Sequence, residues 1–242
     1  MTKFQINFYL YNMNFDNYKF RCSSLGKIMT NPRNKKDILS QTAKSYLMEV
    51  FIKEVYGREK DIYSEEMEKG NYTEQDSLTL IQHYYNDGLI LKNQETIENE
   101  YITGTPDIVL EDRIVDAKSS WDIFTFFNAD GSNKDYEWQL KGYMSLKDKR
   151  KADLCYCLNN TPEWMIVSEK TRQMYRRHIE DGSQEMMDME AKIDKLMIYD
   201  DIPENQRIKV FSFELTDEDI ENMKTKITEA RKYLNQLLSN LK

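Results

Sequence analysis

The chain has 242 residues, of which 40% are hydrophobic, so it is long and apolar enough to form one compact domain over residues 1–242. Its net charge of −8 excludes a broadly basic surface, and its three cysteines, which form no CxxC pair, exclude a disulfide framework or a structural zinc site. No run of about 18 apolar residues predicts a membrane span.

The start of the chain, residues 1–20, is rich in aromatic residues and Asn and is expected to form a strand and its loop. It has neither the basic region nor the long apolar region of a secretory signal. We therefore expect a cytoplasmic protein.

Two helical stretches follow. Apolar side chains at helical spacing predict a helix over residues 36–56, and Gly57 is its expected C-terminal stop. Residues 64–85 are predicted to be mostly helical, with Gly70 interrupting the helix and Gly88 ending it.

The middle of the chain predicts a β-hairpin. Apolar residues at 106–110 and 113–118 flank the polar turn Glu111-Asp112-Arg113, and residues 96–102 form an expected strand before it. The second half then alternates helix and strand, with a helix over 136–146, an interior strand over 152–158, a helix starting with Pro162, a strand over 207–215 and a last helix opened by Thr216 and Asp219.

The last helix carries apolar residues at alternating spacings of three and four, from Ile220 to Leu241. This pattern is typical of a helix that packs on the body of its own domain, which is the interpretation we favour. A coiled-coil contact between copies of the chain is the alternative.

Two acids and a lysine are expected to meet on the hairpin. Asp107 opens its first strand, and Asp116 and Lys118 lie two residues apart on the second, so their side chains point to one face. Two like charges 4 Å apart repel by about 4 kcal/mol at an effective dielectric of 20, so such a pair binds a cation or a proton. Hard oxygen ligands favour Mg²⁺, with Mn²⁺ as a substitute.

Three further residues fit the same centre. Glu74 lies on the apolar edge of its predicted helix, where a carboxylate is costly unless it meets a cation. Gln139 and Tyr143 are four residues apart and share a helical face, which suits hydrogen bonding to phosphate or to a metal-bound water. Ordinary helix surface and core is the alternative for that pair.

Lys118 could act as a base or as an orienting group for the attacking water. The neighbouring carboxylates oppose deprotonation of its ammonium. We therefore expect Lys118 to position the water and to stabilise charge that develops on the phosphate.

The order Gly70-x-x-x-Glu74, Thr105-Pro106-Asp107, Asp116-x-Lys118 and Gln139-x-x-x-Tyr143 resembles that of the PD-(D/E)xK nuclease superfamily. Within it, the chain is most similar to phage lambda-type exonucleases and YqaJ-type viral recombinase nucleases, over about residues 20 to 235. The resemblance implies a restriction-endonuclease-like α/β core, with a central mixed β-sheet flanked by helices.

The resemblance also implies DNA contacts. The segment from Arg21 to Gly26 is similar to the family's N-terminal Ser motif, with Ser24 the better match for the phosphate-binding serine and Ser23 and Arg21 beside it. A helix cap is the alternative role of the two serines. The Ala117 carbonyl is a further expected metal ligand. The remaining expected DNA contacts are Thr105, Ser119 and Ser120.

The implied activity is Mg²⁺-dependent hydrolysis of linear duplex DNA from a 5′ end, in phage-type recombination. A single-strand-annealing protein is the expected partner, a homotrimer the expected assembly, and a bacterial or phage-infected cell the setting. The alternatives are a structure- or site-specific endonuclease and a catalytically silent protein that binds DNA ends.

The acidic composition limits how DNA is held. We expect a narrow basic path built from two clusters, Lys134–Lys151 and Arg172–Arg177. The aromatic residues of 121–127 could stack on unpaired bases, although we expect most of them in the core.

Overall fold

The computed structural model describes residues 13–60, 63–86 and 90–241. The expected strand and loop over residues 1–20 lies mostly outside these residues; within them, Phe20 and Arg21 form the short strand β1. The elements up to the hairpin are η1 (Cys22–Ser24), α2 (Leu25–Met29), α3 (Gln41–Tyr56), α4 (Glu65–Tyr72), α5 (Glu74–Tyr85), β2 (Ile97–Glu98) and β3 (Ile102–Gly104).

The remaining elements carry the larger sheet and the C-terminal helices. They are β4 (Ile108–Val109), β5 (Arg113–Ser119), α6 (Ile123–Asn128), α7 (Lys134–Leu146), β6 (Lys151–Cys157), α8 (Glu163–Arg177), α9 (Gln184–Met197), η2 (Glu204–Gln206), β7 (Ile208–Glu214) and α10 (Asp217–Ser239).

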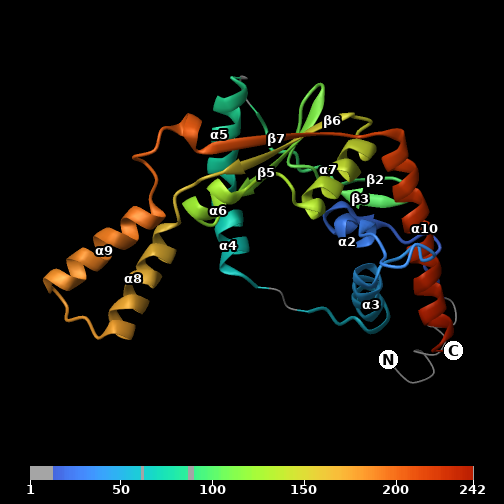
Figure 1. The fold of residues 1–242 in the computed structure, drawn as a ribbon, viewed down its shortest axis with the longest axis horizontal. Coiled ribbons are helices and arrows are strands. Elements are labelled where there is room, and N and C mark those ends of the chain that lie inside the picture. The colour runs from blue at the N-terminus through green and yellow to red at the C-terminus, as the bar shows by residue number, and fades with distance from the viewer. Residues whose placement is uncertain (1–12, 61–62, 87–89, 242) are drawn as a thin grey trace.

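A mixed four-stranded sheet forms the centre of the molecule, in the order β4-β5-β6-β7 (Figure 1). Strands β5 and β6 are parallel, whereas β4 and β7 pair antiparallel to them. A smaller mixed sheet has the order β1-β3-β2. The expected α/β class with a mixed sheet flanked by helices is therefore confirmed, although the strands form two sheets instead of one.

The predicted hairpin is present. Ile108 of β4 pairs with Val115 of β5, and the amide of Leu110 donates to the carbonyl of Arg113 at 2.9 Å to close the turn. Strand β5 is buried on both faces, because α7 packs on one side and α5 on the other. The strand expected over residues 96–102 is divided instead between β2 and β3.

The helices of the N-terminal half begin and end at different residues from those predicted. Helix α3 starts at Gln41, because the Ser40 side chain accepts from the amide of Ala43 and caps it, and it ends at Gly57 as expected, with φ of 63°. The second stretch breaks at Thr73, since Gly70 lies inside α4. Gly88 lies outside the described residues.

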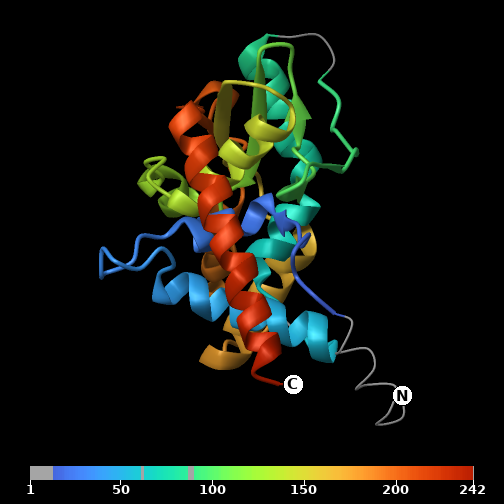
Figure 2. The ribbon, with the colours of Figure 1, turned by 90° about the vertical axis from the view of Figure 1, so that its right-hand side faces the viewer.

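The last helix packs on the body of the domain. Thr216 and Asp219 form a capping box at its start, as predicted. Its buried face includes Met223, Ile227 and Leu234, and Figure 2 shows α10 lying across α2 and α3. The favoured interpretation of the apolar spacing is thus confirmed.

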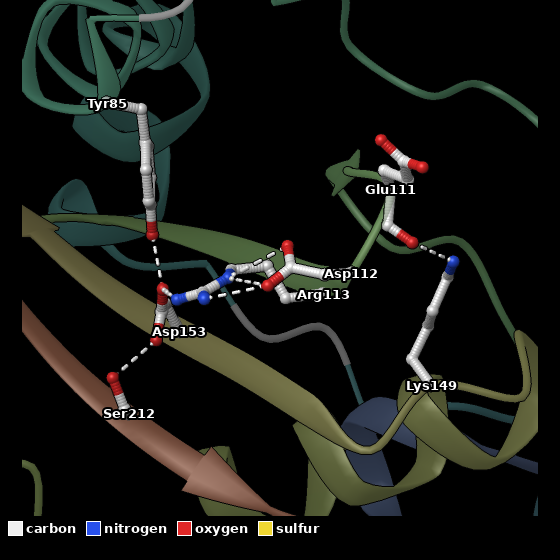
Figure 3. A network of polar contacts seen from close by, with 7 residues as sticks. All are labelled: Tyr85, Glu111, Asp112, Arg113, Lys149, Asp153 and Ser212. Atoms are coloured by element: carbon white, nitrogen blue, oxygen red, sulfur yellow. Dashed lines mark hydrogen bonds and ion pairs between the residues drawn. The ribbon is translucent and has the colours of Figure 1, made fainter.

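A polar network ties β5, β6, β7 and α5 together (Figure 3). The buried Asp153 accepts from Ser212 Oγ at 2.6 Å, from Arg113 Nη1 at 2.8 Å and from the hydroxyl of Tyr85. Burial raises the pKa of Asp153, but these hydrogen bonds and the Arg113 charge outweigh it, so the net pKa is lowered. The network holds the end of the sheet where β5 begins.

Helices α8 and α9 form a hairpin that projects from the body (Figure 1). It has a small core of its own, built around Ile166, Ile179, Met189 and Ile193. Pro162 is the N-cap of α8 and not its first helical residue. No helix within residues 13–60, 63–86 and 90–241 is long and apolar enough to cross a membrane.

Candidate active site

Strand β5 brings Asp116 and Lys118 to its α7 side. Asp116 is only 2% exposed, and its Oδ2 lies 2.6 Å from Lys118 Nζ. The same ammonium lies 4.9 Å from the ring centroid of Tyr136 on α7. Asp116 and Lys118 therefore lie on one face of β5, as predicted.

Asp107 joins this pair from the start of β4. Its Oδ2 accepts a hydrogen bond from the backbone amide of Ala117 at 3.0 Å, and this bond holds the carboxylate against β5. Ala117 is the residue between Asp116 and Lys118. Burial and the charge of Asp116 raise the pKa of Asp107 to about 6. The charge of Asp116 is thus close enough to oppose the ionisation of Asp107, as the sequence predicts.

The charge on Lys118 is stabilised. Burial lowers its pKa, but the charge of Asp116 and the ion pair with it outweigh burial, and the net pKa is raised. The ammonium therefore stays protonated at neutral pH. A protonated lysine can orient a water or stabilise a phosphate but cannot take a proton.

Helix α7 supplies Gln139 and Tyr143, which both face this centre. Gln139 Nε2 lies 3.0 Å from the Tyr143 hydroxyl and 3.4 Å from Asp116 Oδ1. Both side chains are buried. Burial, and then the nearby Asp116 charge, raise the pKa of Tyr143, so its phenol remains a donor. The structure thus brings together five of the six residues predicted to be catalytic.

Glu74 is the sixth, and the structure does not place it in a three-carboxylate cluster. It opens α5, which packs on the opposite face of β5, and its Oε1 lies 2.5 Å from Lys92 Nζ. Its charge still contributes to the raised pKa of Asp107. Sequence reasoning missed Lys92, whose position gives no periodic or motif signal.

The other two carboxylates, those of Asp107 and Asp116, fit a site for a hard divalent cation. The Oδ2 atom of Asp116 is buried and forms the 2.6 Å ion pair with Lys118, but it accepts no hydrogen bond of good geometry within the described part of the chain. Oxygen ligands of this kind suit Mg²⁺ or Mn²⁺. However, among residues 13–60, 63–86 and 90–241 there is no group of three or more His, Cys, Asp or Glu side chains that could hold a metal.

Two of the expected DNA contacts make hydrogen bonds within the protein instead, and a third is buried with a hydroxyl that has no hydrogen-bond partner in the described part of the chain. Ser119 Oγ lies 2.9 Å from Thr73 Oγ1, Ser120 is only 5% exposed, and Thr105 Oγ1 lies 2.7 Å from Thr96 Oγ1. Ser119 is the last residue of strand β5, and its side chain is half-buried.

The N-terminal Ser motif lies beside the centre. Ser24 occupies the N-cap position of α2 but its side chain makes no capping hydrogen bond, and Ser23 and Arg21 are exposed. Cys22 points inward. A Cβ on Gly104 would come within 2.6 Å of Tyr143 Cε1 and 2.9 Å of Cys22 Sγ, so this glycine permits their close approach.

The basic clusters predicted from the sequence are largely neutralised. Lys134 and Lys141 pair with Glu137, Arg150 pairs with Asp217, and ion pairs also involve Lys147, Arg172 and Arg177. The expected basic path is therefore not formed by these residues alone. Ion-pair partners distant in sequence, such as Asp217, could not be assigned from the sequence.

The aromatic segment after β5 is divided between core and surface. Phe126 is buried, Trp121 is half-buried, and Phe124 and Phe127 are 64% and 62% exposed. Sequence reasoning also missed Lys69, which is 1% exposed and donates from Nζ to the carbonyl of Trp121 at 2.7 Å.

No protein-family model and no curated protein matches the chain. Among solved structures, it is similar to a phage-related exonuclease from Haemophilus somnus 129PT, with a TM-score of 0.76, 28% identity, and coverage of 98% of this chain and 100% of that one. An alkaline exonuclease from Laribacter hongkongensis, LHK-Exo, shares the fold at a TM-score of 0.62 and 12% identity, over 93% of this chain and 92% of that one. The resemblance to lambda-type exonucleases that the motifs predict is therefore confirmed.

Proposed function

We propose that the chain is a Mg²⁺-dependent DNA exonuclease that hydrolyses phosphodiester bonds of linear duplex DNA from a 5′ end. The observation that supports it best is the meeting of Asp107, Asp116 and Lys118 beside Gln139 and Tyr143. The similarity to a phage-related exonuclease over the whole chain adds to it.

Asp107 and Asp116 would hold the cation, with the Ala117 carbonyl as a further ligand. When bound, Mg²⁺ would supply positive charge at the scissile phosphate and a more acidic water. The burial of the Asp107 carboxylate beside the Asp116 charge, which raises the pKa of Asp107, is the feature that such an ion would relieve. Glu74 could join only if its contact with Lys92 opened.

Lys118 would orient the attacking water and stabilise the charge that develops on the phosphate. Its ammonium is held by Asp116 at 2.6 Å and by the face of Tyr136. A preorganised cation of this kind stabilises a transition state without a reorganisation cost.

Gln139 would fix the Asp116 carboxylate, and the hydroxyl of Tyr143 would donate to a phosphate oxygen. The amide Nε2 of Gln139 lies near both Asp116 and Tyr143, which joins the two side chains of α7 to the strand. The helix spacing of four residues makes this arrangement possible.

The wider role is also a proposal. The similarity to a phage-related exonuclease supports a function in phage-type recombination with a single-strand-annealing partner, and a homotrimer is the proposed assembly.

The test uses linear duplex labelled at either 5′ or 3′ ends, together with closed circular duplex. Each is incubated with the protein and Mg²⁺ or EDTA. Rapid Mg²⁺-dependent release of the 5′ label, with the circle intact, is the expected result. Rapid cleavage of the circle would support an endonuclease instead, and early loss of the 3′ label would reverse the proposed polarity.

A further inference from the structure

A pocket of 260 Å³ lies between α2, α3 and the segment that follows α3. Seven of its lining side chains are charged, five of them cations and two of them carboxylates. This excess of positive charge is notable in a chain whose net charge is −8.

Two of the five cations are neutralised. Lys60 Nζ lies 2.5 Å from Glu49 Oε1, and Lys53 Nζ lies 2.8 Å from Glu59 Oε2. Arg21, Lys27 and Arg58 have no ion-pair partner in the part of the chain that the structure describes. The pocket therefore has three positive charges left to offer an anion.

The other polar groups of the pocket are also donors. Lys27 Nζ lies 5.2 Å from the ring centroid of Tyr46, which holds the ammonium over the ring. Burial raises the pKa of Tyr46, although Ser24 and Arg21 act against this, so its phenol stays protonated. Guanidinium, ammonium and hydroxyl donors converging on one cavity suit the oxygens of a phosphate.

The pocket adjoins the centre through η1. Arg21 and Ser24 line it, while Cys22 between them points the other way, toward Tyr143 and Gly104. A strand of DNA that crosses η1 could therefore reach both. The neutralised basic clusters elsewhere leave this pocket as a better place for a phosphate contact.

We propose that Lys27, Tyr46 and Arg58 bind a backbone phosphate of the DNA substrate, apart from the scissile bond. This inference rests on the proposed function and adds residues outside the predicted Ser motif. The DNA would then pass along α3 and the segment that follows it.

The test measures the affinity of duplex DNA for the cleavage-deficient Lys118→Ala protein at several salt concentrations. In that background, the double variant K27A/R58A is compared with K224A/K232A, which removes two cations of α10 that pair with Glu221 and Glu229. The expected result is about tenfold weaker binding and a salt slope shallower by about one for K27A/R58A only.

A second variant changes the charge in the opposite direction. Glu49→Gln frees Lys60, so it should tighten DNA binding and steepen the salt slope without loss of a cation. Affinities of K27A/R58A and E49Q within twofold of the parent would overturn the inference.

Binding of inorganic phosphate distinguishes the two possible ligands of the pocket, a phosphate of the DNA backbone and free phosphate. If K27A/R58A loses binding of inorganic phosphate by calorimetry while DNA affinity is unchanged, free phosphate is the ligand and the DNA assignment is wrong. A parent protein that neither binds nor cleaves DNA would contradict the proposed function itself. A parent that cleaves DNA, with K27A/R58A binding normally, would contradict only this inference.

Discussion

The Oδ2 atom of Asp107 accepts a hydrogen bond from the backbone amide of Ala117 at 3.0 Å. This single contact joins the start of β4 to the middle of β5 and holds one carboxylate beside another, because Asp116 is the residue before Ala117. Burial, and then the charge of Asp116, raise the pKa of Asp107 to about 6. The two nearby carboxylates therefore lower the stability of the metal-free protein, and a bound cation would offset this loss.

Replacement of Asp107 by Asn should therefore stabilise the metal-free protein. The substitution removes one of two opposed charges but keeps an oxygen that can accept from Ala117. We expect a melting temperature a few degrees above that of the parent, roughly what 1 kcal/mol gives. Added Mg²⁺ should raise the melting temperature of the parent and not of the variant. A lower melting temperature of the metal-free variant would show that the two carboxylates do not repel each other.

Removal of the Tyr143 hydroxyl tests the support that α7 gives the site. Tyr143→Phe deletes the partner that Gln139 Nε2 contacts at 3.0 Å while keeping the buried ring. We expect DNA cleavage to slow by about ten- to a hundredfold, the value of one hydrogen bond to a charged group. Leu146→Met, which changes the last residue of α7 and leaves the hydroxyl in place, is the control. An unchanged rate in Tyr143→Phe would remove the phenol from the site.

The polar network around Asp153 should make stability depend on pH. Because the folded-state pKa of Asp153 is lowered, its ion pair contributes fully above the unfolded-state pKa, near 4, and the contribution is lost as the pH falls through the folded-state value. Asp153→Asn should cost about 3 kcal/mol at pH 7, as expected when one partner of a buried pair is removed.

Urea unfolding of the parent and Asp153→Asn at pH 7 and pH 3 measures this difference. The gap between the two proteins should be large at pH 7 and should shrink at pH 3. A gap that is independent of pH would mean that the charge of Asp153 contributes nothing.

The buried Lys69 makes stability rise with pH as Asp153 does, but at higher pH and because its charged form is the one that burial penalises. Burial lowers its pKa to about 8, only partly offset by Asp122, so the charged form is disfavoured in the fold. The unfolded chain therefore binds more protons between about pH 8 and 10.4, and stability from this group rises with pH across that window.

Lys69→Met tests this assignment. Below pH 8 the variant should be as stable as the parent or more so, and its advantage should decrease toward pH 10. Thermal unfolding at pH 7, 8.5 and 10 measures it. An advantage that grows with pH would contradict the assignment, because the burial cost of the charge would then be absent.

The parts of the fold that short-range patterns specify were predictable. The hairpin turn, the Gly57 stop, the Thr216 capping box and the Gln139–Tyr143 face each depend on residues within a few positions of one another. For this reason the meeting of Asp107, Asp116 and Lys118 could be inferred from two adjacent strands.

Contacts between distant segments were not predictable in this way. Glu74 was expected at the metal, but Lys92, eighteen residues on, lies against it. The lysines of 134–151 were expected to be free, but Lys141 also pairs with Asp219 at 2.9 Å. Ion-pair choice depends on which charges the packing of helices brings together, and no local pattern records that.

The most direct test of the central claim is the initial rate at which Mg²⁺ supports nucleotide release from linear duplex DNA, compared among the parent, Lys118→Ala and Lys232→Ala. Lys232 is the control because it pairs with Glu229 on α10 and belongs neither to the site nor to the expected basic path. The account predicts release by the parent and by Lys232→Ala, and a loss of at least a hundredfold, about 2.7 kcal/mol, in Lys118→Ala. Equal rates for the parent and Lys118→Ala, or release that persists in EDTA, would contradict it.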